Sequence, residues 1–269
     1  METTNIPKKI FIVPYRNRVE HREFFIRYIT NFVLQDIPTT EYEIYFSHQL
    51  DSRIFNRGAV KNIGFMAIRE KYPNHYKQMT FIFHDIDIMP YDKNVVPYDT
   101  KMGEVQHYYG FTHALGGLFA IKGADFERLN GFPTYWGWGL EDNCLQKRCK
   151  NLGITINRSH FYKLGNKKIL HISDTITKKV ADSTGYRFTH DTGVDGLTAI
   201  KRVSKKITIF NNIHNKHSNI YMIDITQFDA FTKVADEKIK DTSVAELAKN
   251  GVKIKKPINK IMQNIMYNN

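Results

Sequence analysis

The chain has 269 residues, of which 42% are hydrophobic and 25% are charged, as in a globular protein with a full hydrophobic core. Its apolar stretches are too short to cross a bilayer, and Met1 to Lys9 lacks the layout of a signal peptide, so we expect neither a membrane span nor a secretory leader. The net charge of +12 would suit a phosphorylated substrate, but no zinc-finger or RNA-binding motif accompanies it, so we expect no nucleic acid partner.

The two cysteines, Cys144 and Cys149, lie close together in one predicted helix. Their spacing suits neither a disulfide nor a metal knuckle. We therefore predict two reduced thiols and a cytoplasmic location.

The first half of the chain alternates strand-like and helix-like segments. We predict strands at 10–14, 42–47 and 79–83, and helices at 20–34 and 56–69. Such alternation is typical of an α/β fold with a parallel sheet, in which ligands bind beyond the carboxyl ends of the strands. Polar clusters at 14–18 and 85–87 follow two of the three strands, so they mark the predicted site.

The second half is less regular. We predict strands at 116–121, 154–157, 168–172 and 220–225, and helices at 124–129 and from 141 to about 150. We divide the chain into a catalytic domain, residues 1–235, and a lysine-rich appendage, residues 236–269. Apolar residues between 258 and 266 share one helical face, which indicates either a helix packed on its own domain or a peripheral contact with a membrane or partner.

Asp85 and Asp87 follow a buried strand and emerge on the same side of it. Two neighbouring carboxylates repel each other unless a cation lies near them, and their oxygens suit Mg²⁺ or Mn²⁺ bound to phosphate. A turn or helix cap is the alternative interpretation of this short motif. Arg16, Arg18 and Arg57 carry guanidinium groups that match a diphosphate, although any one of them could be a solvated surface residue.

Both tryptophans, Trp136 and Trp138, lie in the segment Tyr135–Gly139 (YWGWG), where glycines between large rings let a ring project toward a ligand. Glu141 and Asp142 follow at the start of a predicted helix. They either complement the helix dipole or supply a carboxylate base beside a sugar platform, and the clustering of rare residues favours the base. His171 has apolar neighbours, and by itself it would more often be a core or surface residue than a metal ligand.

Taken in order, these segments resemble the β-1,4-galactosyltransferase family, glycosyltransferase family 7. The resemblance covers roughly residues 9 to 225, and the block around Trp138 is its most specific part. The matching segments are Phe11–Arg18 (FIVPYRNR), Phe55–Phe65 (FNRGAVKNIGF), Phe83–Pro90 (FHDIDIMP), Gly116–Gly117, Asn130–Pro133 (NGFP), Tyr135–Asp142 (YWGWGLED) and Asp195–Leu197 (DGL).

The resemblance implies a single-domain nucleotide-sugar glycosyltransferase fold of the GT-A type, with a Rossmann-like mixed sheet. It also implies an inverting, metal-dependent transfer of galactose or N-acetylgalactosamine from a UDP-sugar to a hydroxyl of a glycan or glycoside, in a β-linkage expected to be 1,4. The residues that would hold the donor are Pro14, Arg16, Arg18, Phe55, Arg57, Asp85, Ile86, Asp87, Gly117 and Trp138.

Mn²⁺, or Mg²⁺, would be held by Asp87 and His171. Some family members have a methionine as a further metal ligand, and in this chain Lys168 or a neighbouring residue stands at that position. By the same resemblance, Glu141 would bind the acceptor and Asp142 would take the proton from its attacking hydroxyl.

The chain departs from the family in three ways. Asn143 and Cys144 stand where many members have aspartates, and Ala114 and Leu115 stand where galactosyl-specific members carry an aromatic pair. The smaller Ala114 leaves room for an N-acetyl group. The family's usual anchor helix and lumenal disulfide are lacking, which indicates a cytoplasmic enzyme of a microbe or virus. Two alternatives remain: the same fold using UDP-glucose or UDP-GlcNAc, and a non-catalytic carbohydrate-binding protein.

Overall fold

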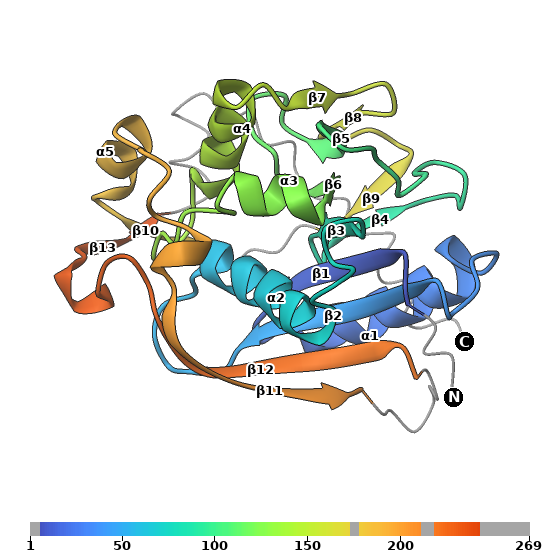
Figure 1. Ribbon diagram of the computed structural model, residues 1–269, viewed down its shortest axis with the longest axis horizontal. Coiled ribbons are helices and arrows are strands. Elements are labelled where there is room, and N and C mark those ends of the chain that lie inside the picture. The colour runs from blue at the N-terminus through green and yellow to red at the C-terminus, as the bar shows by residue number, and fades with distance from the viewer. Residues whose placement is uncertain (1–5, 173–177, 211–217, 243–269) are drawn as a thin grey trace.

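The computed structural model describes residues 6–172, 178–210 and 218–242. Within these residues the main feature is a nine-stranded mixed sheet with the spatial order β11-β12-β2-β1-β3-β6-β5-β7, and β8 pairs with β5 (Figure 1). Its strands are β1 (Lys9–Tyr15), β2 (Tyr42–Gln49), β3 (Thr80–His84), β5 (Glu104–Gly110), β6 (Leu118–Lys122), β7 (Thr155–Asn157), β8 (Tyr162–Lys163), β11 (Lys201–Ile209) and β12 (Ile220–Asp229).

Two small antiparallel pairs and five α-helices complete the part of the chain that is described. The pairs are β4 (Ile88–Pro90) with β9 (Ile169–His171), and β10 (Lys178–Ala181) with β13 (Ile239–Thr242). The helices are α1 (Val19–Tyr28), α2 (Arg57–Lys71), α3 (Gly123–Arg128), α4 (Glu141–Asn151) and α5 (Thr184–Thr189). A π-helical turn at Ile29–Val33 extends α1.

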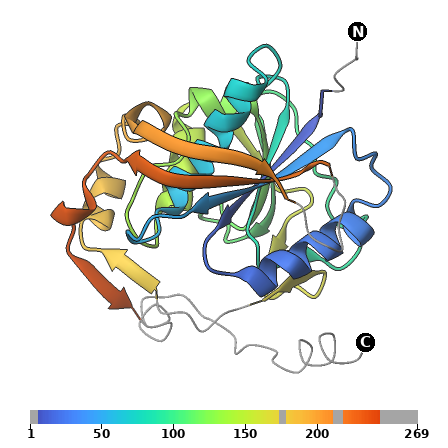
Figure 2. The same ribbon diagram turned by 90° about the horizontal axis from the view of Figure 1, so that it is seen from below.

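The central strands are buried on both faces. Along β1, Ile10 and Ile12 pack into one core together with α2, whereas Phe11 and Val13 pack into a second core together with α1. This alternation is what a strand covered on both sides requires. Figure 2 shows α1 and α2 on opposite sides of the strands. The protein is therefore a three-layered α/β structure, and its site residues lie at the edge of the middle layer.

The alternating elements predicted for the first half are confirmed, because β1 pairs in parallel with both β2 and β3. The sheet becomes antiparallel only at β3–β6, β6–β5 and β11–β12. The mixed Rossmann-like sheet of a GT-A fold is thus confirmed as well. The strands β4, β5, β8, β10, β11 and β13 were not predicted.

The predicted division at residue 235 stays a prediction, but the first part of the predicted appendage is built into the structure. Its residues Ile239–Thr242 form β13, which pairs in register with β10. The predicted apolar helical face between 258 and 266 lies outside the described residues. Among the described helices, none has the length and apolar character needed to cross a membrane.

We expect the protein to lose stability as the pH falls from about 6.5 toward 4, because two of its histidines are buried. In the unfolded chain both rings take up a proton near pH ~6.5. In the folded protein, burial lowers the pKa of His84 to about 4, and burial together with the charge of Arg158 lowers the pKa of His107 to about 4. The unfolded state therefore binds more protons in this window, so the free energy of unfolding falls with the pH, by about 1.4 kcal/mol for each unit of pKa difference.

Urea unfolding at about pH 7, 5.5 and 4.5 checks this expectation. A His107→Gln variant should show a shallower pH dependence than the wild-type chain, whereas a variant of the exposed His160, His160→Gln, should keep the wild-type dependence. Identical pH dependence in all three proteins would contradict the assignment.

Candidate active site

Three elements that are distant in sequence meet at one point of the structure. β3 ends at His84, directly before Asp85, and α2 begins at Arg57. The third element, α4, begins at Glu141 and continues with Asp142. The predicted donor and base residues from these three segments are in direct contact.

The contact is made by the guanidinium of Arg57. One nitrogen, Nη2, donates to both carboxylate oxygens of Asp85 at 2.6 Å. The other, Nη1, donates to Glu141 Oε1 at 2.6 Å and to Asp142 Oδ2 at 2.7 Å. Arg57 therefore holds three carboxylates from two other elements, using the planar fork that distinguishes arginine from lysine.

In this cluster, burial and the neighbouring charges shift the pKa values of Arg57 and Asp85 in opposite directions, and the neighbouring charges have the larger effect. Burial alone would lower the pKa of Arg57, but Asp142, Asp85 and Glu141 together raise it well above its ordinary value. Burial would likewise raise the pKa of Asp85, but the charge of Arg57 holds it well below its usual range. Both groups are therefore ionised at neutral pH, as a charge-based site requires.

The start of α2 is fixed by Asn56, which is fully buried. Its side-chain oxygen accepts from the backbone N–H of Ala59 at 2.9 Å, as an N-cap does. Its amide nitrogen donates to Thr134 O at 3.0 Å. Gly58 allows close approach here, since a Cβ at that position would lie 2.1 Å from Pro133 O. Asn56 and Gly58 thus position Arg57 against the segment that leads to α4.

The start of α4 is fixed in a comparable way. Gly137 has a φ of +84°, which favours glycine, and its N–H donates to Phe55 O at 3.1 Å. Asp142 is in close contact with Gly116, because a Cβ on Gly116 would lie 2.3 Å from Asp142 Oδ2. The backbone N–H of Leu115 donates to Asp142 O at 3.0 Å. Gly116 therefore leaves the space that the Asp142 carboxylate occupies.

Lys61 belongs to the same cluster but was not singled out from the sequence. It lies one turn after Arg57 on α2, is 1% exposed, and its ammonium donates to Asp142 Oδ1 at 3.1 Å. The signal that could have revealed it is its spacing of four residues from Arg57, which places both side chains on one helix face.

The two arginines of the polar cluster after β1 make different contacts, Arg18 with a carboxylate and Arg16 with backbone carbonyls. Arg18 Nη1 donates to Asp87 Oδ2 at 3.1 Å, so the ends of the parallel strands β1 and β3 are joined. Arg16 lies apart from the carboxylates and donates to two backbone carbonyls, those of Arg53 and Asp51. Arg16 thereby supports the loop between β2 and α2.

Asp87 and His171, the predicted metal ligands, lie on adjacent segments. β4 pairs with β9 so that Ile88 faces His171, and the N–H of Ile172 donates to Asp87 O at 2.8 Å. The hydroxyl of Tyr109 is 3.2 Å from His171 Nδ1. Burial and the negative charge of Asp87 both raise the pKa of this tyrosine, so Asp87 lies near the same hydroxyl. The described residues hold no cluster of three or more His, Cys, Asp or Glu side chains arranged to hold a metal. The two predicted metal ligands are thus brought onto neighbouring segments by the pairing of β4 with β9.

The two tryptophans have different surroundings. Trp138 is 39% exposed and could act as a sugar platform. Trp136 is 1% exposed, stacks on Phe228 with ring centroids 5.6 Å apart, and donates from Nε1 to Thr232 O at 2.8 Å. The expectation that the glycines let rings project thus fits Trp138, whereas Trp136 is a core residue.

The remaining predicted donor residues lie around this edge of the sheet. Pro14 lies near the carboxyl end of β1, and half-buried Phe55 directly precedes Asn56. Ile86 is buried in the core on the α1 side. Gly117 has a φ of +75°, and its carbonyl accepts from the Asp85 N–H at 2.9 Å.

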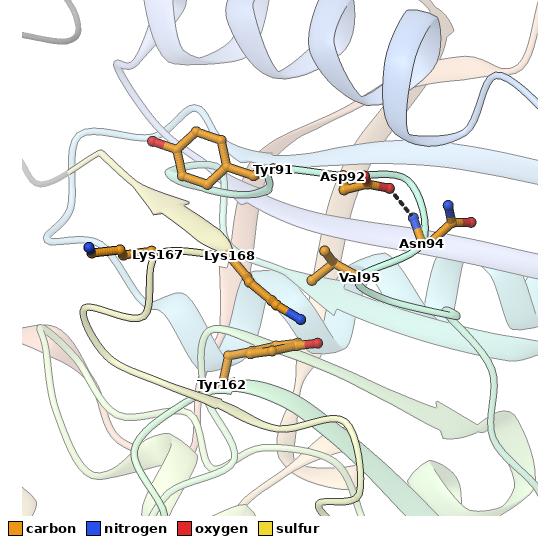
Figure 3. A pocket seen from close by; sticks show the side chains of 7 residues that line it. All are labelled: Tyr91, Asp92, Asn94, Val95, Tyr162, Lys167 and Lys168. Carbon is orange, nitrogen blue, oxygen red and sulfur yellow. Dashed lines mark hydrogen bonds between the residues drawn. The ribbon is translucent and has the colours of Figure 1, made fainter.

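A separate cavity of about 330 Å³ lies between the segment after β4 and the segment before β9 (Figure 3). Its lining residues are Tyr91, Asp92, Asn94, Val95, Tyr162, Lys167 and Lys168. In Figure 3 Lys168 extends toward Tyr162, and its ammonium is 5.7 Å from the centroid of that ring. The residue expected in place of a methionine ligand therefore lines this cavity.

A mixed sheet with carboxylates and arginines gathered beyond the carboxyl ends of its parallel strands is the arrangement expected of a GT-A type nucleotide-sugar glycosyltransferase. Comparison with known proteins agrees. The family model described as the N-terminal region of glycosyl transferase group 7 matches residues 3–99, and that described as the N-terminal domain of galactosyltransferase matches residues 97–173. Together they span more than half of the chain, which belongs to the β-1,4-galactosyltransferase family.

Individual relatives match over part of their length. β-1,4-Galactosyltransferase 7 of Drosophila melanogaster is 28% identical over 185 residues, covering 65% of this chain and 55% of the relative. Human β-1,4-galactosyltransferase 1 is 33% identical over 163 residues, covering 56% of this chain and 39% of the relative. The chain thus spans about half the length of these relatives or less.

Among solved structures, a mutant of the Drosophila β-1,4-galactosyltransferase 7 in complex with manganese, UDP-Gal and xylobiose superposes with a TM-score of 0.66. The match has 20% identity and covers 86% of this chain and 97% of that one. The catalytic domain of the same enzyme in complex with xylobiose gives a TM-score of 0.64. These matches show that the folds are alike.

Replacing Arg57 by methionine should destabilise the protein because it leaves three carboxylates without their shared cation. We expect the free energy of unfolding at neutral pH to fall by about 3 to 5 kcal/mol, as when one partner of a buried ion pair is removed. The deficit should shrink as the pH falls below about 4, because the charge of Arg57 lowers the pKa of Asp85 to about 2 and the stability gained from this shift is lost in that window.

Urea unfolding of Arg57→Met beside Arg202→Met provides the measurement. Arg202 forms an exposed ion pair with Asp229, and its loss should change stability little. An Arg57→Met protein as stable as Arg202→Met would contradict the central place of Arg57 in the cluster.

Proposed function

We propose that the chain is an inverting, metal-dependent glycosyltransferase that moves galactose or N-acetylgalactosamine from a UDP-sugar to a hydroxyl of a glycan or glycoside. The observation that carries this proposal is the contact of Asp142, at the start of α4, with Arg57, which also holds Asp85 after β3. A carboxylate suited to act as a base thus lies beside cations suited to a diphosphate.

The donor and cofactor are proposed from the relatives and from the local chemistry. The Drosophila enzyme was solved with manganese and UDP-Gal, and the relatives are named as galactosyltransferases. Asp87 and His171 fit a site for Mn²⁺ or Mg²⁺, since they lie on paired segments, and two protein ligands leave positions for diphosphate oxygens and water. A bound divalent cation would stabilise the negative charge that develops on the departing diphosphate.

The proposed reaction is a single displacement. Asp142 accepts the proton of the acceptor hydroxyl as its oxygen forms a bond to the anomeric carbon of the donor sugar. The bond from that carbon to the diphosphate breaks on the opposite face, so an α-linked donor yields a β-linked product. Arg18 and Arg57 hold the leaving diphosphate, Glu141 binds the acceptor, and Trp138 packs against the sugar.

The identity of the transferred sugar depends on the segment before the paired glycines. Ala114 is buried and small, and its neighbour Leu115 is bonded through its N–H to the backbone of Asp142. A small side chain at this place supports use of an N-acetylated donor as well as galactose. UDP-glucose and UDP-GlcNAc are the alternative donors, and the β-1,4 linkage is part of the proposal.

A non-catalytic carbohydrate-binding protein is the second candidate, because Asn143 and Cys144 replace family aspartates. Their contacts favour catalysis, since neither is directed into the carboxylate cluster. Asn143 Nδ2 donates to His113 O at 3.1 Å, and Cys144 is fully buried.

Replacing the proposed base should abolish turnover without abolishing donor binding. We expect Asp142→Asn to reduce the rate of UDP release by roughly 100- to 10,000-fold with Mn²⁺ present, as is typical when a positioned base is lost. A panel of UDP-galactose, UDP-GalNAc, UDP-glucose and UDP-GlcNAc, with and without sugar acceptors, also identifies the donor.

Asp229→Asn serves as the control, because Asp229 forms an exposed ion pair with Arg202. It should retain wild-type turnover. If the wild-type chain binds glycans but turns over none of the four donors, the carbohydrate-binding alternative is favoured instead.

Removing either proposed metal ligand should weaken the response to Mn²⁺. We expect Asp87→Ala and His171→Ala each to raise the Mn²⁺ concentration for half-maximal activity by at least ~10- to 100-fold. A loss of that size is typical when a residue that only orients a metal ligand is removed. His160→Ala, at an exposed histidine, should leave the Mn²⁺ titration unchanged. Unaltered titrations for both ligand variants would argue against this metal site.

We further propose that the enzyme works in the cytoplasm. Cys144 and Cys149 are free and buried, as predicted, and burial raises the pKa of each thiol to about 12. Such thiols are unreactive and suit a reducing compartment. Cell fractionation should recover the protein with cytosolic markers, whereas recovery in a secretory compartment would contradict this part of the proposal.

A further inference from the structure

A fully buried lysine supports the proposed base from the side of α2. Lys61 is 1% exposed, and its ammonium donates to Asp142 Oδ1 at 3.1 Å. The same ammonium lies 4.4 Å from the centroid of the Phe132 ring. The opposite carboxylate oxygen, Asp142 Oδ2, is held by Arg57 at 2.7 Å.

A lysine is seldom buried in this way without a specific partner, because an ammonium removed from water is costly unless it is paired. Here the partners are one carboxylate oxygen and one aromatic face, both of which favour a cation. Lys61 occupies the fourth position after Arg57 on the same helix, so both cations extend from one rigid face.

The charges around Asp142 indicate why a second cation matters. Arg57 pairs with Asp85, Glu141 and Asp142, so one guanidinium serves three carboxylates. In the proposed reaction Arg57 must also contact the donor diphosphate. Lys61 is buried and pairs with Asp142. Unlike Arg57, it has no proposed contact with the donor, so it can stay paired with Asp142 when the donor binds.

We propose that Lys61 is a positioning residue for Asp142, an inference that rests on the proposed transferase function. It fixes Oδ1 of the carboxylate, so that Oδ2 points toward the acceptor when Arg57 engages the donor. Lys61 itself touches neither substrate. Its loss therefore affects the chemical step and leaves donor binding in place.

The test compares kcat and the donor KM for wild type, Lys61→Met and Lys71→Met, with Mn²⁺ and the best donor and acceptor of the panel. Methionine keeps much of the length and apolar volume of the lysine but removes its charge. Lys71 is the matched control, because it lies on the same helix and pairs with Glu43 at 2.8 Å instead. Thermal unfolding of each variant confirms the fold, and Lys61→Gln, which keeps a hydrogen-bond donor, replaces Lys61→Met if that variant does not fold.

We expect Lys61→Met to lower kcat by about 10- to 100-fold, as a displaced catalytic group does, with the donor KM within about twofold of wild type. Lys71→Met should keep both constants. In an Asp142→Asn background, Lys61→Met should cause no further loss, because the two residues act as one unit. A purely structural role would lower the rate by the same factor in both backgrounds.

The outcomes separate this inference from the proposed function. If wild type turns over a donor and Lys61→Met keeps its kcat, or loses the same factor in the Asp142→Asn background, the positioning role is wrong and the transferase function stands. If wild type turns over no donor, the proposed function fails and the role of Lys61 fails with it.

Discussion

The ion pairs of Arg57 connect the parts of this structure that matter for its chemistry. The guanidinium reaches Asp85 after β3 and both Glu141 and Asp142 at the start of α4, and all four contacts are between 2.6 and 2.7 Å. Without a cation, three carboxylates this close would repel one another, and burial would oppose their ionisation. The arrangement of the strand end and the helix start therefore depends on one side chain, which is also the one proposed to meet the donor diphosphate.

Small residues and buried amides around the cluster keep it in place. Asn56 caps α2 and is bonded to the segment before α4, while Gly58 and Gly116 leave the space for a backbone carbonyl and for the Asp142 carboxylate. Such rigidity suits catalysis, because a base and a charge clamp act only when held in the productive geometry. The three carboxylates share the Arg57 cation, and under the proposed function a diphosphate competes with them for it.

The sequence predicted the parts of the site that follow regular patterns. Polar clusters after two strands marked the site, and Arg18 and Asp87 from these clusters are in contact, since the carboxyl ends of parallel strands lie side by side. It did not reveal Lys61, because a lone lysine on a helix is usually solvated and only tertiary packing buries this one. Nor did it reveal β11, a lysine-rich, largely exposed strand at the sheet edge. Trp136 was misread for the same reason, since its partner Phe228 lies far along the chain.

The most direct test of the account is a crystal structure of Asp142→Asn grown with Mn²⁺ and the donor, with the ion located by its anomalous scattering. The account predicts the ion between Asp87 and His171, the diphosphate in contact with Arg57, and the sugar beside residue 142. An ion or a donor bound elsewhere, with Arg57 still holding Asp85 and Glu141 alone, would contradict it.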